Sequence, residues 1–135
     1  MMYITKVMKQ LYDVTEFDWL GFKLLDEDDL TFHHILKKED GGKYEISNGA
    51  LLTYRGHAYL HVIEEIDYET YLNLNIILKE INLANNITES VRTQIENIFT
   101  DFEEKHFKYL LKGKKKKNKH KAISKRKKSQ ANRKD

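Results

Sequence analysis

The chain has 135 residues, which is the length of one domain, and 40% of them are hydrophobic, enough for a modest core. It contains no cysteine, so disulfide scaffolds, thiol catalysis and cysteine-ligated zinc or iron–sulfur sites are excluded. The net charge of +3 averages two opposite regions: residues 1–111 carry −9 and residues 112–135 carry +12. Such asymmetry predicts a polyanionic partner, either a nucleic acid or an anionic membrane.

Membrane and secretory segments are not expected. The longest apolar runs are only a few residues, far short of the ~20 needed to span a bilayer. The N-terminal residues show no apolar run followed by a small-residue cleavage site, so we expect no secretory signal. The sequence therefore predicts a cytoplasmic protein with a basic tail.

The first half of the chain predicts a mixture of helix and strand. Apolar residues at helical spacing indicate a helix over residues 1–13, and the β-branched and aromatic run at 30–35 indicates a strand. A loop with two glycines follows. Residues 44–47 and 51–54 are expected to form short strands around a turn at Asn48–Gly49, and a helical pattern starts near Arg55.

The second half predicts helices and then a tail. Apolar residues recur at three- and four-residue steps over 67–111, with a break at 83–86 and Thr88 as the cap of the following helix. Residues 112–135 contain one large apolar residue, Ile123, so we expect this basic tail to be disordered in isolation. We expect one mainly helical α+β domain over residues 1–111.

Four of the six histidines fall between residues 33 and 61, and their arrangement is more informative than any one of them. His33 and His34 are adjacent on the expected strand, so they point to opposite faces unless the strand bends. His57 and His61 are four residues apart, so on a helix they share one face and can hold a single cation.

Residues 31–61 resemble the motif of HNH endonucleases: a histidine pair, a Gly-Gly loop, a central asparagine and two histidines four apart. The resemblance implies a ββα-metal fold, here spanning residues 31–64 and supported by helices at 1–13 and 67–111. It implies His33, His57 and His61 as ligands of one divalent cation, His34 as the general base, and Asn48 as the residue that braces the loop and orients that base. Many members also carry zinc-binding cysteines, whereas the nuclease colicins, like this chain, do not. Flanking helices must then hold the motif.

These groups suit phosphodiester hydrolysis. An imidazole with a pKa near neutrality can deprotonate water, and a divalent cation can stabilise charge at the scissile phosphate. Three histidines with open coordination positions are typical of a catalytic site. Nitrogen ligands suit Ni²⁺, Zn²⁺ or Mn²⁺ better than Mg²⁺, but the sequence leaves the choice among these four ions open.

The tail supplies the expected affinity for nucleic acid. Its lysines and arginines would release counterions from phosphates, which gives binding that weakens with salt and has little sequence preference. Arg55 is a further candidate phosphate contact. The tail residues predicted to bind nucleic acid are Lys114, Lys115, Lys116, Lys117, Lys125, Arg126, Lys127 and Lys128. A solubility or localisation tail is the alternative, and no apolar face accompanies the lysines to favour a membrane.

The leading interpretation is a metal-dependent DNA endonuclease, with RNA left open as a substrate. The alternative is a non-catalytic nucleic-acid-binding protein whose metal site is structural or decayed. A secreted nuclease toxin and a plain helical structural protein rank below these. Members of the family are common in bacteriophages, so the resemblance implies a bacterial host cytoplasm. The oligomeric state is open, although a one-site enzyme that cuts both strands would need a homodimer.

Overall fold

A computed structural model describes residues 2–108, and its fold is α+β, as the sequence predicts. Its sheet has two strands, whereas the sequence predicted three. The basic tail therefore lies outside the described residues. Two 3-10 turns, η1 (Lys38–Asp40) and η2 (Ile46–Asn48), lie between the strands. The strands and helices, in chain order, are α1 (Met2–Leu11), β1 (Thr31–His34), β2 (Gly49–Leu52), α2 (Tyr54–Ile66), α3 (Tyr68–Ala84) and α4 (Glu89–Lys105).

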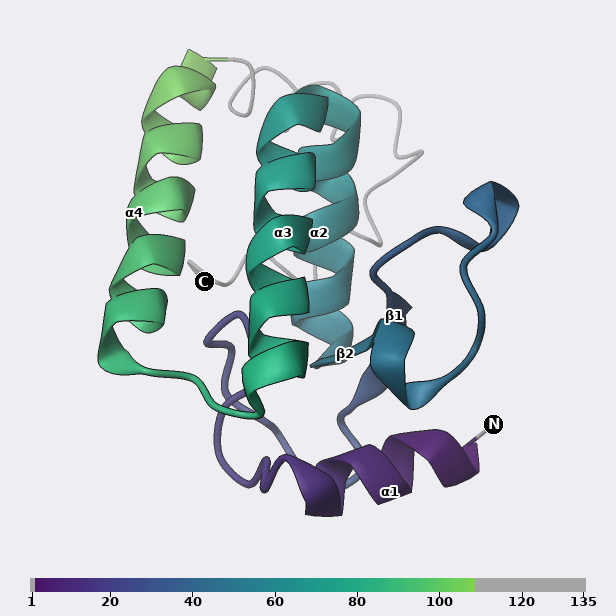
Figure 1. Cartoon of the computed structure of the whole chain (residues 1–135). Coiled ribbons are helices and arrows are strands. Elements are labelled where there is room, and N and C mark those ends of the chain that lie inside the picture. The colour runs from purple at the N-terminus through teal and green to yellow at the C-terminus, as the bar shows by residue number, and fades with distance from the viewer. Residues whose placement is uncertain (1, 109–135) are drawn as a thin grey trace, which may run out of the picture.

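The helices α2, α3 and α4 lie side by side, α1 crosses one end of them, and the small sheet packs beside α2 and α3 (Figure 1). β1 and β2 are antiparallel, with His33 opposite Ala50 and His34 opposite Gly49. Within residues 2–108 the helices are too short or too polar to span a bilayer.

One expected element is wrong. The sequence predicted a hairpin with strands at 44–47 and 51–54 and a turn at Asn48–Gly49, but Ile46–Asn48 forms η2 and β2 begins at Gly49. Gly49 has φ −110°, whereas the common Asn-Gly hairpin turn needs positive φ at both residues. The side chain of Asn48 instead hydrogen-bonds across the connection, to Leu36 and Lys43.

The helix boundaries follow from capping side chains. Thr53 caps α2 by accepting a hydrogen bond from the Gly56 amide, and Asp67 caps α3. Thr88 caps α4, which confirms the predicted cap. α3 ends at Ala84, inside the predicted break, because Asn85 adopts the left-handed conformation with φ 56°.

A single core lies between the strands and the four helices. Its buried apolar residues come from every helix, from β2 and from the segment between α1 and β1, and the partly buried Phe32 of β1 packs against them. The largest fully buried apolar side chains are Trp19, Phe102, Met8, Leu51, Leu52, Leu60, Ile63, Leu74, Leu78, Ile81 and Ile95.

A buried carboxylate, Asp18, ties the segment before β1 to the start of α2. The amides of Leu20 and Phe22 donate to its Oδ1 at 2.9 Å, and the amide and hydroxyl of Thr53 donate to its Oδ2 at 2.7 and 2.8 Å. Burial raises the pKa of this carboxyl, and the four donated hydrogen bonds oppose that rise. A Cβ on Gly56 would lie 2.4 Å from the same carboxylate, so only glycine fits there. This Asp18 cluster fixes where α2 starts and hence where its histidines lie.

Candidate functional site

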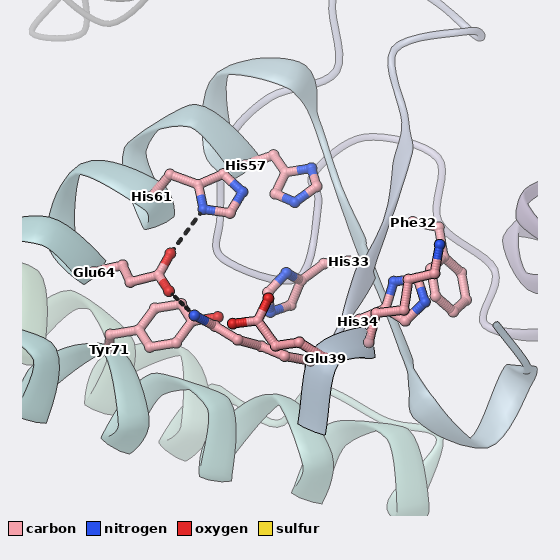
Figure 2. Close-up of a pocket in the computed structure, with 10 residues that line it drawn as sticks. Phe32, His33, His34, Glu39, His57, His61, Glu64 and Tyr71 are labelled. Carbon is pink, nitrogen blue, oxygen red and sulfur yellow. Dashed lines mark hydrogen bonds and ion pairs between the residues drawn. The ribbon is translucent and has the colours of Figure 1, made fainter. Parts of the chain in front are cut away.

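Three of the histidines gather beside β1 and α2. Figure 2 shows His57 and His61 on α2 facing the same space as His33, which comes from β1. The ring centroids of His33 and His57 are 5.3 Å apart, and those of His57 and His61 are 4.9 Å apart with the rings stacked. They line a pocket of about 300 Å³. The structure thus brings together the three side chains that the sequence nominated as ligands.

His33 is buried, with 3% of its surface exposed. Its Nε2 lies 2.7 Å from Oδ1 of Asn75, a residue of α3. Burial lowers the pKa of His33 to about 4, and the hydrogen bond to Asn75 only partly offsets this. The imidazole is therefore neutral at pH 7, the form in which a histidine binds a cation.

His57 lies on the first full turn of α2, next to the strands. Its Nδ1 lies 2.8 Å from the hydroxyl of Thr31, which in turn donates to the carbonyl of Leu52. Burial lowers the pKa of His57 to about 3, and the charges that His33 and His61 acquire on protonation add to the effect. His57 is therefore also neutral at pH 7.

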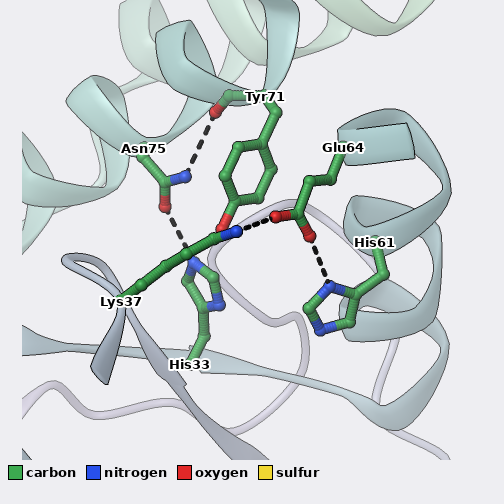
Figure 3. Close-up of polar contacts among 6 residues, drawn as sticks. All are labelled: His33, Lys37, His61, Glu64, Tyr71 and Asn75. Atoms are coloured by element: carbon green, nitrogen blue, oxygen red, sulfur yellow. Dashed lines mark hydrogen bonds and ion pairs between the residues drawn. The ribbon is translucent and has the colours of Figure 1, made fainter. Parts of the chain in front are cut away.

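His61 is more exposed and belongs to a chain of polar contacts at the pocket mouth (Figure 3). Its Nδ1 lies 3.1 Å from Oε1 of Glu64, and the other carboxylate oxygen of Glu64 pairs with Lys37. The Lys37 ammonium also lies 5.8 and 5.7 Å from the ring centroids of Tyr68 and Tyr71. Burial would raise the pKa of Glu64, but the hydrogen bonds from Lys37 and His61 outweigh it and lower that pKa.

His34 lies on the opposite face of β1, as strand alternation predicts. Its ring packs edge-on to Phe32, with centroids 4.9 Å apart, and stacks on Tyr44 at 6.2 Å. It still lines the same pocket, at the side away from the three other histidines (Figure 2). The expected general base is therefore at the margin of the site.

Asn48 is a buried brace across the connection between the strands. Its Oδ1 accepts from the Leu36 amide at 2.8 Å, and its Nδ2 donates to the carbonyls of Leu36 and Lys43, each at 3.0 Å. Its own carbonyl accepts from the amide of Ile35. Gly42 passes so close that a Cβ would lie 1.8 Å from the Leu36 carbonyl oxygen. Asn48 and Gly42 together hold the segment that follows His34.

Helix α3 holds the strand–loop–strand segment through a polar stripe, defined as Asn75, Lys79 and Asn82. Asn75 bonds His33, and Lys79 donates to the carbonyl of Ser47 at 2.6 Å. Asn82 donates to the carbonyls of Ile46 and Gly49, both at 2.8 Å. This stripe is an instance of the support from flanking helices that the absence of cysteine required.

The remaining predicted residues lie elsewhere. Arg55 is on the first turn of α2, where it donates to the Lys23 carbonyl at 2.7 Å and lies over the Phe22 ring. It is not among the residues that line the histidine pocket, and its contact with phosphate stays a prediction. The tail residues between Lys114 and Lys128 fall outside the described residues.

The residues present fit a cation in their chemistry. Two imidazoles that bind one tetrahedral ion at about 2.0–2.1 Å have ring centroids roughly 5 Å apart, which matches both pairs of rings. Within residues 2–108, however, no three histidine or carboxylate side chains are already arranged as a metal site. The rings would have to adjust on binding.

Four residues of the site were missed from the sequence: Thr31, Lys37, Glu64 and Asn75. Glu64 follows His57 by seven residues and His61 by three, so helical spacing could have placed it on their face. Thr31 could have been placed beside the site by strand alternation with His33. Nothing in the sequence singled out Asn75, because it belongs to a helix whose packing against β1 is a tertiary contact.

Comparisons of this chain with protein-family models, with curated proteins and with solved structures gave no match.

Proposed function

We propose that the chain is a metal-dependent endonuclease of the HNH type that hydrolyses DNA phosphodiester bonds. The observation that carries the proposal is the meeting of His33 from β1 with His57 and His61 from α2 around one pocket. The order strand, strand, helix and the bracing by Asn48 add support, because both belong to the resemblance.

His33, His57 and His61 would hold the cation. When bound, a divalent cation supplies positive charge at the scissile phosphate and the leaving oxygen. The neutral imidazoles add no negative charge, so they leave the charge of the cation available to the phosphate. The low pKa values of His33 and His57 keep both rings ready to bind without first losing a proton.

His34 would act as the general base. Its imidazole takes a proton from a water molecule, whose oxygen forms a bond to phosphorus while the bond from phosphorus to the 3′ oxygen breaks. The leaving oxygen receives a proton from solvent. Asn48 would position His34 through the backbone, since it binds the two residues that follow His34 in the chain. The basic tail would bind the DNA backbone without sequence preference.

The test is nicking of supercoiled plasmid by the full chain with Mg²⁺, Mn²⁺, Ni²⁺ or Zn²⁺, and with EDTA. We expect relaxation that needs a metal and falls at least 100-fold in His34→Ala, the size of general-base help. His106→Gln is the control, because His106 bonds Asp67 at the far end of α2. Cutting that survives EDTA or survives His34→Ala would contradict the proposal.

A second candidate is a nucleic-acid-binding protein without catalysis. The packing of His34 against Phe32 and Tyr44, on the strand face opposite His33, favours it. If this second candidate is correct, the wild-type protein and His34→Ala should both shift the plasmid in a gel, and neither should relax it with any of the four metal ions.

A further inference from the structure

His33, His57 and His61 each have one ring nitrogen within hydrogen-bonding distance of an acceptor atom on a neighbouring side chain. Figure 3 shows two of these contacts, from His33 to Asn75 and from His61 to Glu64. The third joins His57 to Thr31. A neutral imidazole carries one N–H proton. When one ring nitrogen donates that proton to an acceptor, the other ring nitrogen carries the free lone pair.

For His33 the direction of the hydrogen bond is fixed by a second contact. Nδ2 of Asn75 donates to the carbonyl of Tyr71 at 3.2 Å, which orients the amide with Oδ1 toward the histidine. Oδ1 can only accept, so the Nε2 of His33 carries the proton. The lone pair of His33 is then on Nδ1, which forms no hydrogen bond within the described residues.

For His57 the acceptor is the hydroxyl oxygen of Thr31. Thr31 donates its one hydroxyl proton to the carbonyl of Leu52 at 3.0 Å, so its oxygen accepts from Nδ1 of His57. For His61 the carboxylate of Glu64 accepts from Nδ1. The lone pairs of His57 and His61 are therefore both on Nε2.

We propose that Asn75, Thr31 and Glu64 are positioning residues that set the tautomers of His33, His57 and His61 for a cation. Asn75 gives the sharpest test, because it contacts His33 from α3, outside the segment of β1, β2 and α2 that holds the histidines. Hydrogen bonds of this kind orient a ligating ring and raise its basicity, and losing one lowers metal affinity about 10–100-fold. The inference rests on the proposed cation site, but the tautomers can be read without a cation.

The first measurement is the long-range ¹H–¹⁵N spectrum of the histidine side chains in the metal-free full chain at pH 7.5. We expect the proton of His33 on Nε2 and that of His57 on Nδ1. A wild-type protein with the His33 proton on Nδ1 would overturn the inference, whatever the protein does to DNA.

The second measurement is the affinity for Zn²⁺ by calorimetry in wild type, Asn75→Leu and Asn82→Leu. Asn82 is the matched control, since it lies on the same helix, is equally buried at 7% exposed and bonds only backbone carbonyls. We expect a 10–100-fold loss in Asn75→Leu and less than threefold in Asn82→Leu. Asn75→Asp keeps the acceptor and should bind within threefold of wild type or more tightly.

The outcomes separate the two proposals. No Zn²⁺ or Ni²⁺ binding by wild type, with the expected tautomers, removes the cation site and the inference built on it. Equal affinity in wild type and Asn75→Leu overturns the positioning role and leaves the nuclease proposal intact. A loss of Zn²⁺ affinity in Asn75→Leu that is absent in Asn75→Asp supports the inference, because a merely structural role would not depend on the acceptor oxygen.

Discussion

Two polar clusters lie against α2, and they differ in how completely their hydrogen-bonding groups are used. In the Asp18 cluster each carboxylate oxygen accepts two hydrogen bonds, and Thr53 both donates and accepts. In the histidine pocket, His33 and His57 each use one ring nitrogen. A fully satisfied buried group stabilises the fold, whereas a ring nitrogen at a pocket that retains its lone pair keeps a position ready for a ligand.

The difference teaches where to look for function among buried polar residues. Burial alone does not separate the clusters, since Asp18 is 0% and His33 3% exposed. The direction and number of hydrogen bonds do separate them. The comparison therefore predicts that changes at Asp18 act mainly on stability and changes at the histidines mainly on binding.

The largest effect is expected from Asp18→Leu. It leaves two backbone amides and the Thr53 amide buried without their acceptor, so the free energy of unfolding should fall on the order of 4 kcal/mol or more. Urea unfolding measures it, with the exposed Asp28→Leu as control. A loss below about 1 kcal/mol would show that the Asp18 cluster does not hold the fold.

Acidification should destabilise the metal-free protein through His33 and His57. Their folded pKa values of about 4 and 3 lie below the unfolded value of 6.5, so the unfolded chain takes up protons first as the pH falls. The contribution of these two histidines to the free energy of unfolding is fully present above pH 6.5 and is lost as the pH falls toward 4 for His33 and 3 for His57. About 2 kcal/mol is lost per histidine by pH 5. Urea unfolding in EDTA at pH 7.5 and 5.0 measures it. The variant His33→Leu/His57→Leu should lose this dependence, and its persistence there would assign it to other groups.

A smaller change in stability is expected from His33→Leu. Apolar burial offsets the lost hydrogen bond to Asn75, so the free energy of unfolding at pH 7.5 should change by about 1 kcal/mol. Zn²⁺ affinity, measured by calorimetry, should nevertheless fall more than about 100-fold. A stability loss as large as that of Asp18→Leu would erase the contrast between the two clusters.

The smallest effect is expected from Lys37→Met. The ion pair with Glu64 lies at the partly exposed mouth of the pocket, where solvent screens it, so its loss should lower the melting temperature little more than the control variant does. Thermal unfolding beside Lys38→Met, an exposed neighbour, provides the measurement. A drop in melting temperature as large as that of Asp18→Leu would show that the pocket mouth is part of the core.

The sequence predicted most of the elements, because local signals determine them. Helical spacing gave the helices, Thr88 marked a cap, and β-branched and aromatic residues marked β1. The hairpin failed because the dipeptide Asn48–Gly49 has a local preference that long-range hydrogen bonds from the Asn48 side chain override. Local propensity is informative only until a buried side chain has partners elsewhere.

The three clustered histidines of the candidate site were predicted from the sequence, and the residues that support them were not. Spacing placed His57 and His61 on one face, and the resemblance added His33. Asn75 supports His33 across 42 residues of sequence, a separation that no local pattern spans. The same holds for Lys79 and Asn82, which bind the connection between the strands from α3.

The brace by Asn48 has a consequence for engineering the chain. One amide side chain joins Leu36, twelve residues upstream, to Lys43, so the intervening residues form a closed loop anchored at its base. Gly41 in this loop has open space around it, although its φ of 98° favours glycine. Lengthening a loop costs little entropy, about 0.6 kcal/mol for each doubling. The segment around Gly41 is therefore an insertion point where a peptide epitope or a fluorescent reporter would be presented next to the pocket while the strands keep their register.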